Sequence, residues 1–233
     1  MKNSVLLLVA VVLMITGAVE AYVIDDMEAP STAWTVYTGG GLSTLENSTE
    51  APYVGSRSLK MVDSVYPYVQ LTTNHGDQSA LKDSYVELAF KFDNPACGWL
   101  GSNGVQIYFG NDSSNRACWM VKESVIQGMA QNNPPADGWY IFHLELDNGL
   151  PTLAGTTLNG VQVPESEAAA WQSGTVDWTQ IDFMAVLVFQ ASYSDVMTQY
   201  MDHVTLGEAI PEPTTIALLG MGGLVSFVSR RRR

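Results

Sequence analysis

Aromatic side chains in two short polar segments are the residues of this chain whose type and spacing best suit ligand recognition. Trp99 lies in a segment rich in Gly and Asn, and Trp119 follows further along. Tyr66 and Tyr68 flank a proline in another segment. Flat rings of this kind cover the apolar face of a sugar, while nearby polar groups bond to its hydroxyls. Trp99, Trp119, Tyr66 and Tyr68 are therefore the candidate glycan-binding residues, with core packing as the alternative for each tryptophan.

Side chains for nucleophilic or acid–base catalysis show no comparable arrangement. The three histidines, His75, His143 and His203, stand apart in the sequence, and the Gly-x-Ser-x-Gly elbow of serine hydrolases is missing. A carboxylate pair for glycoside hydrolysis stays open, because the chain has many acids. No residue is assigned a catalytic role.

The segments that position these residues have the sequence pattern of β-strands. Hydrophobic and polar residues alternate most clearly over Ser84–Asp93, Val105–Phe109 and Tyr140–Leu146. Turn residues rich in Gly, Asn, Asp and Pro separate the segments. The pattern predicts an all-β, antiparallel β-sandwich of the jelly-roll type. Further strands are expected at 22–27, 34–37, 58–63, 68–72, 117–122, 124–129, 180–190 and 199–206, and a short helix within 164–172.

The N-terminus has the features of an export signal. Lys2 precedes an uncharged run whose apolar part, Val5–Ile15, has the length of a signal-peptide core. Small residues at Val19 and Ala21 place cleavage after Ala21, with Ala18 as the alternative, so residues 1–21 form the signal peptide. The sandwich domain is then residues 22–209.

Charge and cysteine content restrict what this domain can bind. Between residues 22 and 209 there are 6 basic and 22 acidic side chains, a formal charge of −16. Such a surface excludes nucleic acid as a partner, because phosphates would be repelled. In an exported chain, Cys97 and Cys118 are expected to form a disulfide; two free buried thiols are the alternative.

Several segments of the domain resemble the galactose-binding-like jelly roll of carbohydrate-binding modules. They are Ile24-Asp25-Asp26-Met27-Glu28, Gly55-Ser56-Arg57-Ser58-Leu59-Lys60, Gly138-Trp139, Asp177-Trp178-Thr179-Gln180-Ile181 and the strand that carries Asp202. The resemblance implies a structural calcium ion where the first and last strands meet, held by Glu28 and Asp202 with Asp26 as a third ligand. Salt bridges or loop caps are the alternative role of these acids.

The C-terminal segment, residues 210–233, resembles the PEP-CTERM sorting signal of exported bacterial proteins. Pro211-Glu212-Pro213 is followed by the uncharged run Thr214–Ser229 and by Arg230, Arg231, Arg232 and Arg233. The two prolines end any regular structure before the segment. The apolar run is just long enough to enter a bilayer as a short transmembrane helix. The arginines after it are expected to stay on the cytoplasmic side. The resemblance implies transient membrane anchoring, an exosortase-type protease as partner, and delivery to the cell surface or an extracellular matrix. An ordinary membrane anchor is the alternative.

Together these features predict an exported, non-catalytic jelly-roll protein that binds a polysaccharide. Two other classes remain open: a secreted glycan hydrolase or lyase on the same fold, and a purely structural surface protein.

Overall fold

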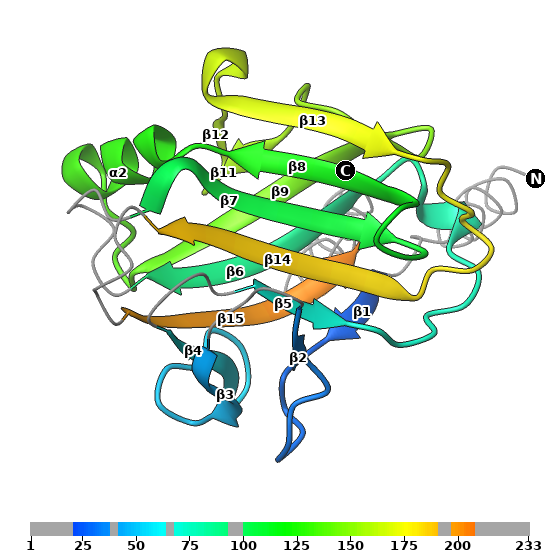
Figure 1. Ribbon diagram of the computed structural model, residues 1–233. Helices are drawn as coiled ribbons and strands as arrows, with labels where there is room; N and C mark the ends of the chain where they lie inside the picture. Colours follow the sequence, from blue (N-terminus) through cyan, green and yellow to red (C-terminus); the bar gives the residue numbers. More distant parts are fainter. Residues whose placement is uncertain (1–20, 38–41, 64–67, 93–99, 191–196, 208–233) are drawn as a thin grey trace, which may run out of the picture. The chain divides into compact units, whose positions relative to one another are not determined.

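A computed structural model describes residues 21–37, 42–63, 68–92, 100–190 and 197–207 of the chain (Figure 1). Residues 22–207 form one compact unit. The signal peptide and the sorting segment expected from the sequence lie outside the described residues. Among the residues described, no helix is long and apolar enough to cross a membrane.

The first sheet follows the order β12-β11-β9-β6-β15-β4-β3, with β1 beside β15 and β10 beside β9. Its strands are β1 (Tyr22–Asp25), β3 (Leu42–Ser48), β4 (Ser58–Asp63), β6 (Tyr85–Phe92), β9 (Trp139–Asp147), β10 (Leu150–Pro151), β11 (Thr157–Leu158), β12 (Val161–Gln162) and β15 (Met197–Leu206).

The second sheet follows the order β13-β8-β7-β14-β5-β2. It lies as one layer over β9, β6 and β15 in Figure 1. Its strands are β2 (Thr35–Val36), β5 (Tyr68–Leu71), β7 (Leu100–Gly110), β8 (Arg116–Val121), β13 (Ala168–Ser173) and β14 (Phe183–Gln190). The strand pairs are antiparallel in both sheets. The expected all-β, antiparallel two-sheet sandwich is confirmed.

Alternating apolar residues of the two sheets meet in one core. Leu88 and Phe90 of β6 and Ile107 and Phe109 of β7 are fully buried there. This is the face that the period-two alternation predicted, because successive side chains of a strand point to opposite sides of its sheet.

Two segments differ from the secondary structure expected from the sequence. Residues 124–129, expected as a strand, lie in the helix α2 (Glu123–Asn132). Their apolar residues Val125, Ile126 and Met129 recur at helical spacing, and that side of the helix packs on the core. The expected helix within 164–172 is instead one 3-10 turn, η2 (Glu165–Glu167), followed by β13. Pairing of β13 with β8 outweighs the helix propensity of its alanines. A second 3-10 turn, η1, spans Ser79–Leu81.

The helix α2 offers a direct test through Gly128. A Cβ added at this position would meet no atom within 4 Å. Gly128→Ala should therefore raise the free energy of unfolding by about 0.5–1 kcal/mol, because alanine loses less backbone entropy in a helix. Thermal melts would show it. The control is Gly104→Ala: Gly104 has φ +56 and its Cβ would clash with the Val121 carbonyl oxygen, so this change should destabilise the domain. Equal midpoints for the two variants would contradict the assignment of α2.

Candidate functional site

The second sheet has an outer face with its own aromatic cluster. In β7 the core residues alternate with Gln106 and Tyr108, which point outward, and in β8 Arg116 and Cys118 lie on the same outer side. Tyr108 and Cys118 pack with β14 side chains in a cluster separate from the main core, and Tyr37 joins it from the end of β2. Strands β5, β7, β8 and β14 contribute side chains to this cluster, and Tyr108 is only 5% exposed in it.

Three tyrosines form the centre of this face. The ring centroids of Tyr37 and Tyr68 are 4.2 Å apart and their planes differ by 32°. Tyr68 and Tyr108 follow at 6.2 Å and 37°. We call Tyr37, Tyr68, Tyr108, Gln106 and Arg116 the tyrosine face.

Arg116 is the only charged residue of the tyrosine face. Its guanidinium carbon lies 4.0 Å from the centroid of the Tyr108 ring, a cation–π contact. The Tyr108 hydroxyl donates a hydrogen bond to Oε1 of Gln106. Nε and Nη1 of Arg116 are shielded from solvent and have no hydrogen-bond partner among the residues described. These two N–H groups are therefore closed to solvent, and Arg116 also interacts with the side chain of Tyr68.

The hydroxyl and thiol groups of this region are neutral at physiological pH. Burial raises the pKa of Tyr68 and of Tyr108 above the usual value for tyrosine, and it raises the pKa of the Cys118 thiol in the same way. The Tyr68 and Tyr108 hydroxyls therefore keep their protons, and that of Tyr108 is donated to Gln106. Flat rings on such a face suit a carbohydrate.

The aromatic residues expected from the sequence fall in three places. Tyr68 belongs to the tyrosine face, while Tyr66 and Trp99 lie outside the described residues. The prediction for Trp119 was wrong: its side chain is fully buried and its Nε1 donates to the Glu145 carbonyl oxygen 3.3 Å away. The alternation of β8 turns Trp119 toward the core, so its ring is closed to a ligand.

The structure describes only one of the two cysteines of the predicted disulfide. Cys118 is a buried free thiol on the outer side of β8, and Cys97 lies outside the described residues. The disulfide therefore stays a prediction.

Sequence reasoning missed Tyr37, Gln106, Tyr108 and Arg116. A signal was present for two of them, because Gln106 and Tyr108 alternate with the apolar residues of their strand. Tyr37 and Arg116 carried none, since only the pairing of β2 with β5 and of β7 with β8 brings them to the same face.

The acids proposed for calcium line the same cavity, but among the described residues the three carboxylates are not placed to hold one ion together. Asp26, Glu28 and Asp202 line one small cavity of about 140 Å³, together with residues of the loop before β4. Oε1 of Glu28 accepts the backbone N–H groups of Ser56 and Arg57 at 2.8 and 3.0 Å. This hydrogen bonding lowers the pKa of Glu28 below its usual value, with the Ser56 hydroxyl as the largest cause.

Asp202 of β15 also accepts hydrogen bonds from this loop. Its Oδ2 accepts the N–H groups of Tyr53 and Val54 at 2.8 and 3.1 Å, and Oδ1 accepts that of His203 at 2.7 Å. Burial nevertheless raises the pKa of Asp202, because it outweighs these bonds. The raised pKa favours the protonated acid when no cation is present, whereas a calcium ion in the cavity would favour the carboxylate.

Two histidines approach one carboxylate on the outer face of the first sheet. His143 Nδ1 lies 3.4 Å from Oε2 of Glu87 and its Nε2 lies 3.7 Å from Oε1 of Glu145. His203 Nε2 lies 3.9 Å from Oε1 of Glu87. Within the described ranges, no three His, Cys, Asp or Glu side chains are placed to hold one metal ion. The cluster is the part of the structure closest to an acid–base arrangement.

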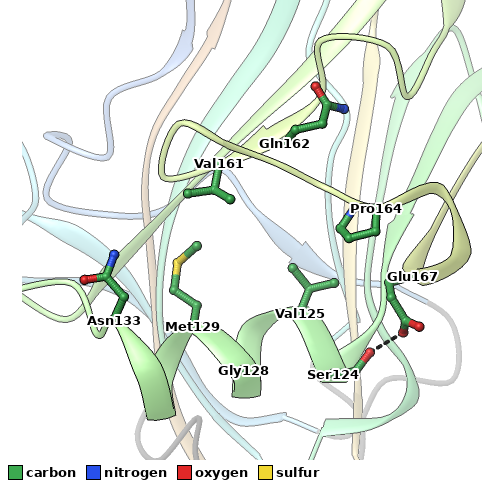
Figure 2. A pocket seen from close by; sticks show the side chains of 9 residues that line it. All are labelled: Ser124, Val125, Gly128, Met129, Asn133, Val161, Gln162, Pro164 and Glu167. Carbon is green, nitrogen blue, oxygen red and sulfur yellow. Dashed lines mark hydrogen bonds between the residues drawn. The ribbon is translucent and has the colours of Figure 1, made fainter.

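A further cavity, of about 490 Å³, lies between α2 and the segment after β11 (Figure 2). Figure 2 shows Val125 and Met129 of the helix facing Val161 and Pro164, with the Ser124 hydroxyl bonded to Glu167 at one end. Its walls are mostly apolar, so it offers a sugar few hydrogen-bond partners.

Comparison with known proteins concerns the C-terminus and the fold. Residues 209–233 match the model of the PEP-CTERM protein-sorting motif. No curated protein matches the chain.

Among solved structures, the chain is similar to a family 11 carbohydrate-binding module from Clostridium thermocellum in complex with a β-1,3-1,4-mixed-linked tetrasaccharide. The identity is 16%, the TM-score 0.49, and the match covers 84% of this chain and 100% of that one. An exo-β-agarase matches at 13% identity and a TM-score of 0.49, over 82% of this chain and 25% of that one. The cellulose-induced protein Cip1 matches at 19% identity and a TM-score of 0.39, over 80% of this chain and 94% of that one. Residues 209–233 thus carry a PEP-CTERM sorting motif, and the described part of the chain before them forms an antiparallel β-sandwich.

Proposed function

We propose that this is an exported surface protein that binds a polysaccharide on the tyrosine face and does not cleave it. The observation that supports binding is the pair of half-buried rings of Tyr37 and Tyr68, whose centroids are 4.2 Å apart, next to the buried ring of Tyr108. Stacking of a sugar on ring surface is the interaction that this pair can supply.

The sorting motif supports the cellular part of the proposal. The Pro-Glu-Pro triplet and the arginine cluster would present the segment to an exosortase-type protease at the membrane. After removal of the segment, the domain would reach the cell surface or an extracellular matrix.

The composition of the face supports binding without hydrolysis. The six strands of the second sheet contain neither Asp nor Glu within their bounds. Glycoside hydrolysis requires a pair of carboxyl groups flanking the bond that is cleaved. The tyrosine face supplies no such pair.

The test is binding of the purified protein to a panel of soluble polysaccharides, measured by affinity electrophoresis and calorimetry. Tyr68→Ala should weaken binding about 10- to 30-fold, because it removes the central ring, a loss of roughly 1.5–2 kcal/mol. Tyr68→Phe is the matched control: it keeps the ring and should keep most of the affinity. Equal affinities of wild type and Tyr68→Ala would contradict the assignment of the site.

The same incubations distinguish the alternative functions. New reducing ends or unsaturated products would favour the enzyme, and their loss in His143→Ala would place catalysis at the His143–Glu87–Glu145 cluster. Absence of both retention and products across the panel would leave the structural role.

We further propose that Glu28 and Asp202 hold a structural calcium ion in the cavity that they line, with backbone carbonyl groups and water in place of a third carboxylate. The ion would fix the loop before β4 to β15 and would take no part in ligand binding.

A further inference from the structure

Trp171 on β13 is the most exposed tryptophan among the residues described. It is 39% exposed, whereas Trp34, Trp119 and Trp139 are each at most 3% exposed and Trp178 is half-buried. The other described tryptophans are thus largely used in packing. The ring of Trp171 keeps surface that a ligand can stack on.

Trp171 lies on the same side of the second sheet as the tyrosine face. It pairs directly with Cys118 of β8, and directly opposed residues of an antiparallel pair share one face of a sheet. Its neighbour Ala170 packs instead against the main core, as the alternation along a strand requires. Cys118 belongs to the cluster that contains Tyr108 and Tyr68, so the tryptophan and the tyrosines share the outer side of the sheet.

The exposed ring surface lies near two opposite edges of this sheet. β13 is one edge strand, and β5 lies beside β2, the strand at the other edge (Figure 1). The row of directly paired residues that begins at Trp171 reaches β5 two residues from Tyr68. The residues between them in this row are Cys118, Tyr108 and Ala185, each at most 5% exposed. Buried side chains therefore form the floor of the face, and rings that a ligand can reach stand at its two ends.

The separation of the two ends determines the length of ligand that can contact both. β8, β7 and β14 lie between β13 and β5, so four steps between neighbouring strands separate Trp171 from Tyr68. At about 4.8 Å for each step, the two strands are roughly 19 Å apart across the sheet. One residue of an extended polysaccharide covers about one such step. A chain that crosses the strands would therefore stack at both ends with roughly five residues.

We infer that Trp171 is a second stacking site for the polysaccharide of the tyrosine face, and that the ligand is an extended chain that crosses the strands from Trp171 to Tyr68. This inference rests on the proposed function and names its ligand class, an extended chain rather than a mono- or disaccharide. Once such a chain is bound at one end, its contact at the other end is intramolecular, which raises its affinity above that of a short fragment.

The test compares chain lengths in wild-type protein and in variants of Trp171. The panel includes laminarin, arabinoxylan and galactomannan, and each polymer that wild-type protein binds is compared by calorimetry with its own fragments, from disaccharides to octasaccharides. The affinity of wild type should rise about 10-fold between the trisaccharide and the hexasaccharide. Trp171→Ala should remove this rise and lower the affinity for the polymer about 10-fold, while the affinity for the trisaccharide stays unchanged.

Two variants serve as controls for the loss of the ring. Trp171→Phe keeps an aromatic ring and should retain most of the affinity for the hexasaccharide. Val23→Ala removes an apolar side chain that is 52% exposed on β1 of the first sheet, and it should bind like wild type. Melting midpoints near that of wild type ensure that a loss of affinity is not caused by unfolding.

The outcomes separate this inference from the proposed function. Full affinity of Trp171→Ala for the polymer, or an equal loss for trisaccharide and hexasaccharide, would overturn the second stacking site while leaving glycan binding intact. Tyr68→Ala should weaken binding of fragments of every length. A dimer that disappears in Trp171→Ala while binding is unchanged would assign the ring to contact between copies of the chain. Failure of wild-type protein to bind any polysaccharide would overturn the proposed function, and this inference with it.

Discussion

Trp119→Ala should destabilise the domain by about 3–5 kcal/mol and lower its melting midpoint by roughly 6–20 °C. The ring is 0% exposed and lies among the core residues contributed by both sheets. Its removal leaves a cavity, and it also removes the donor to the Glu145 carbonyl oxygen. Large cavities are costly because the surrounding residues close them only in part.

Trp171→Ala is the matched control for this prediction. Trp171 lies on β13, paired with Cys118 on the neighbouring strand, and is 39% exposed. Its replacement should shift the midpoint by only a few degrees. Similar midpoints for the two variants, measured by thermal denaturation, would show that Trp119 is not part of the core. Trp119→Phe should fall between wild type and Trp119→Ala, since it refills part of the cavity.

The main strands could be predicted because one face of each is buried. In β6, for example, Val86, Leu88, Phe90 and Phe92 alternate with polar residues, and this local pattern is sufficient to define the strand. In β8 the same reasoning was available for Ala117, Trp119 and Val121. Trp119 was misplaced because it follows Cys118, whose expected disulfide with Cys97 would have held its ring beside that of Trp99, and this was weighed above the alternation of its own strand.

The site itself depends on contacts that are distant in sequence. Tyr37 and Tyr68 meet through the pairing of β2 with β5, and Tyr108 reaches them across β14. No spacing along the chain encodes this order of strands. The convergence of Glu28 and Asp202 was accessible only because a resemblance supplied the adjacency of the first and last strands, which the pairing of β1 with β15 now shows.

Edge elements were the least predictable part of the fold. The alanines of β13 favour a helix, yet the open edge of β8 offers backbone partners that the segment takes instead. The reverse holds for α2, whose β-branched Val125 and Ile126 favour a strand locally. In both cases tertiary packing decides between two local structures of similar energy.

Removing calcium should lower the melting midpoint at neutral pH. If the cation is present at about 100 times its dissociation constant, its loss costs roughly 2.7 kcal/mol, or about 5–11 °C for a domain of this size. Thermal denaturation with and without EDTA measures the shift, and added calcium should reverse it. An unchanged midpoint at neutral pH would remove calcium from the proposal.

The pH dependence of this shift follows from Asp202. Burial holds its pKa in the folded state above the usual 3.8, so without a cation its contribution to stability is complete below that value. The contribution is lost as the pH rises through the folded-state pKa, because the buried carboxylate must then carry its charge. Calcium binds the ionised form, so the rise in midpoint on adding excess calcium to metal-free protein should be largest at neutral pH and should shrink as the pH falls through the folded-state pKa.

Two variants make this prediction specific to the cavity. Asp202→Asn should abolish the response to EDTA, since it removes a ligand and its titration together. Glu50→Gln should keep the full response, because Glu50 pairs with Lys60 and Tyr200 and does not line the cavity. A response that survives in Asp202→Asn would place the cation elsewhere, and Asp202 would then act only through its bonds to Tyr53, Val54 and His203.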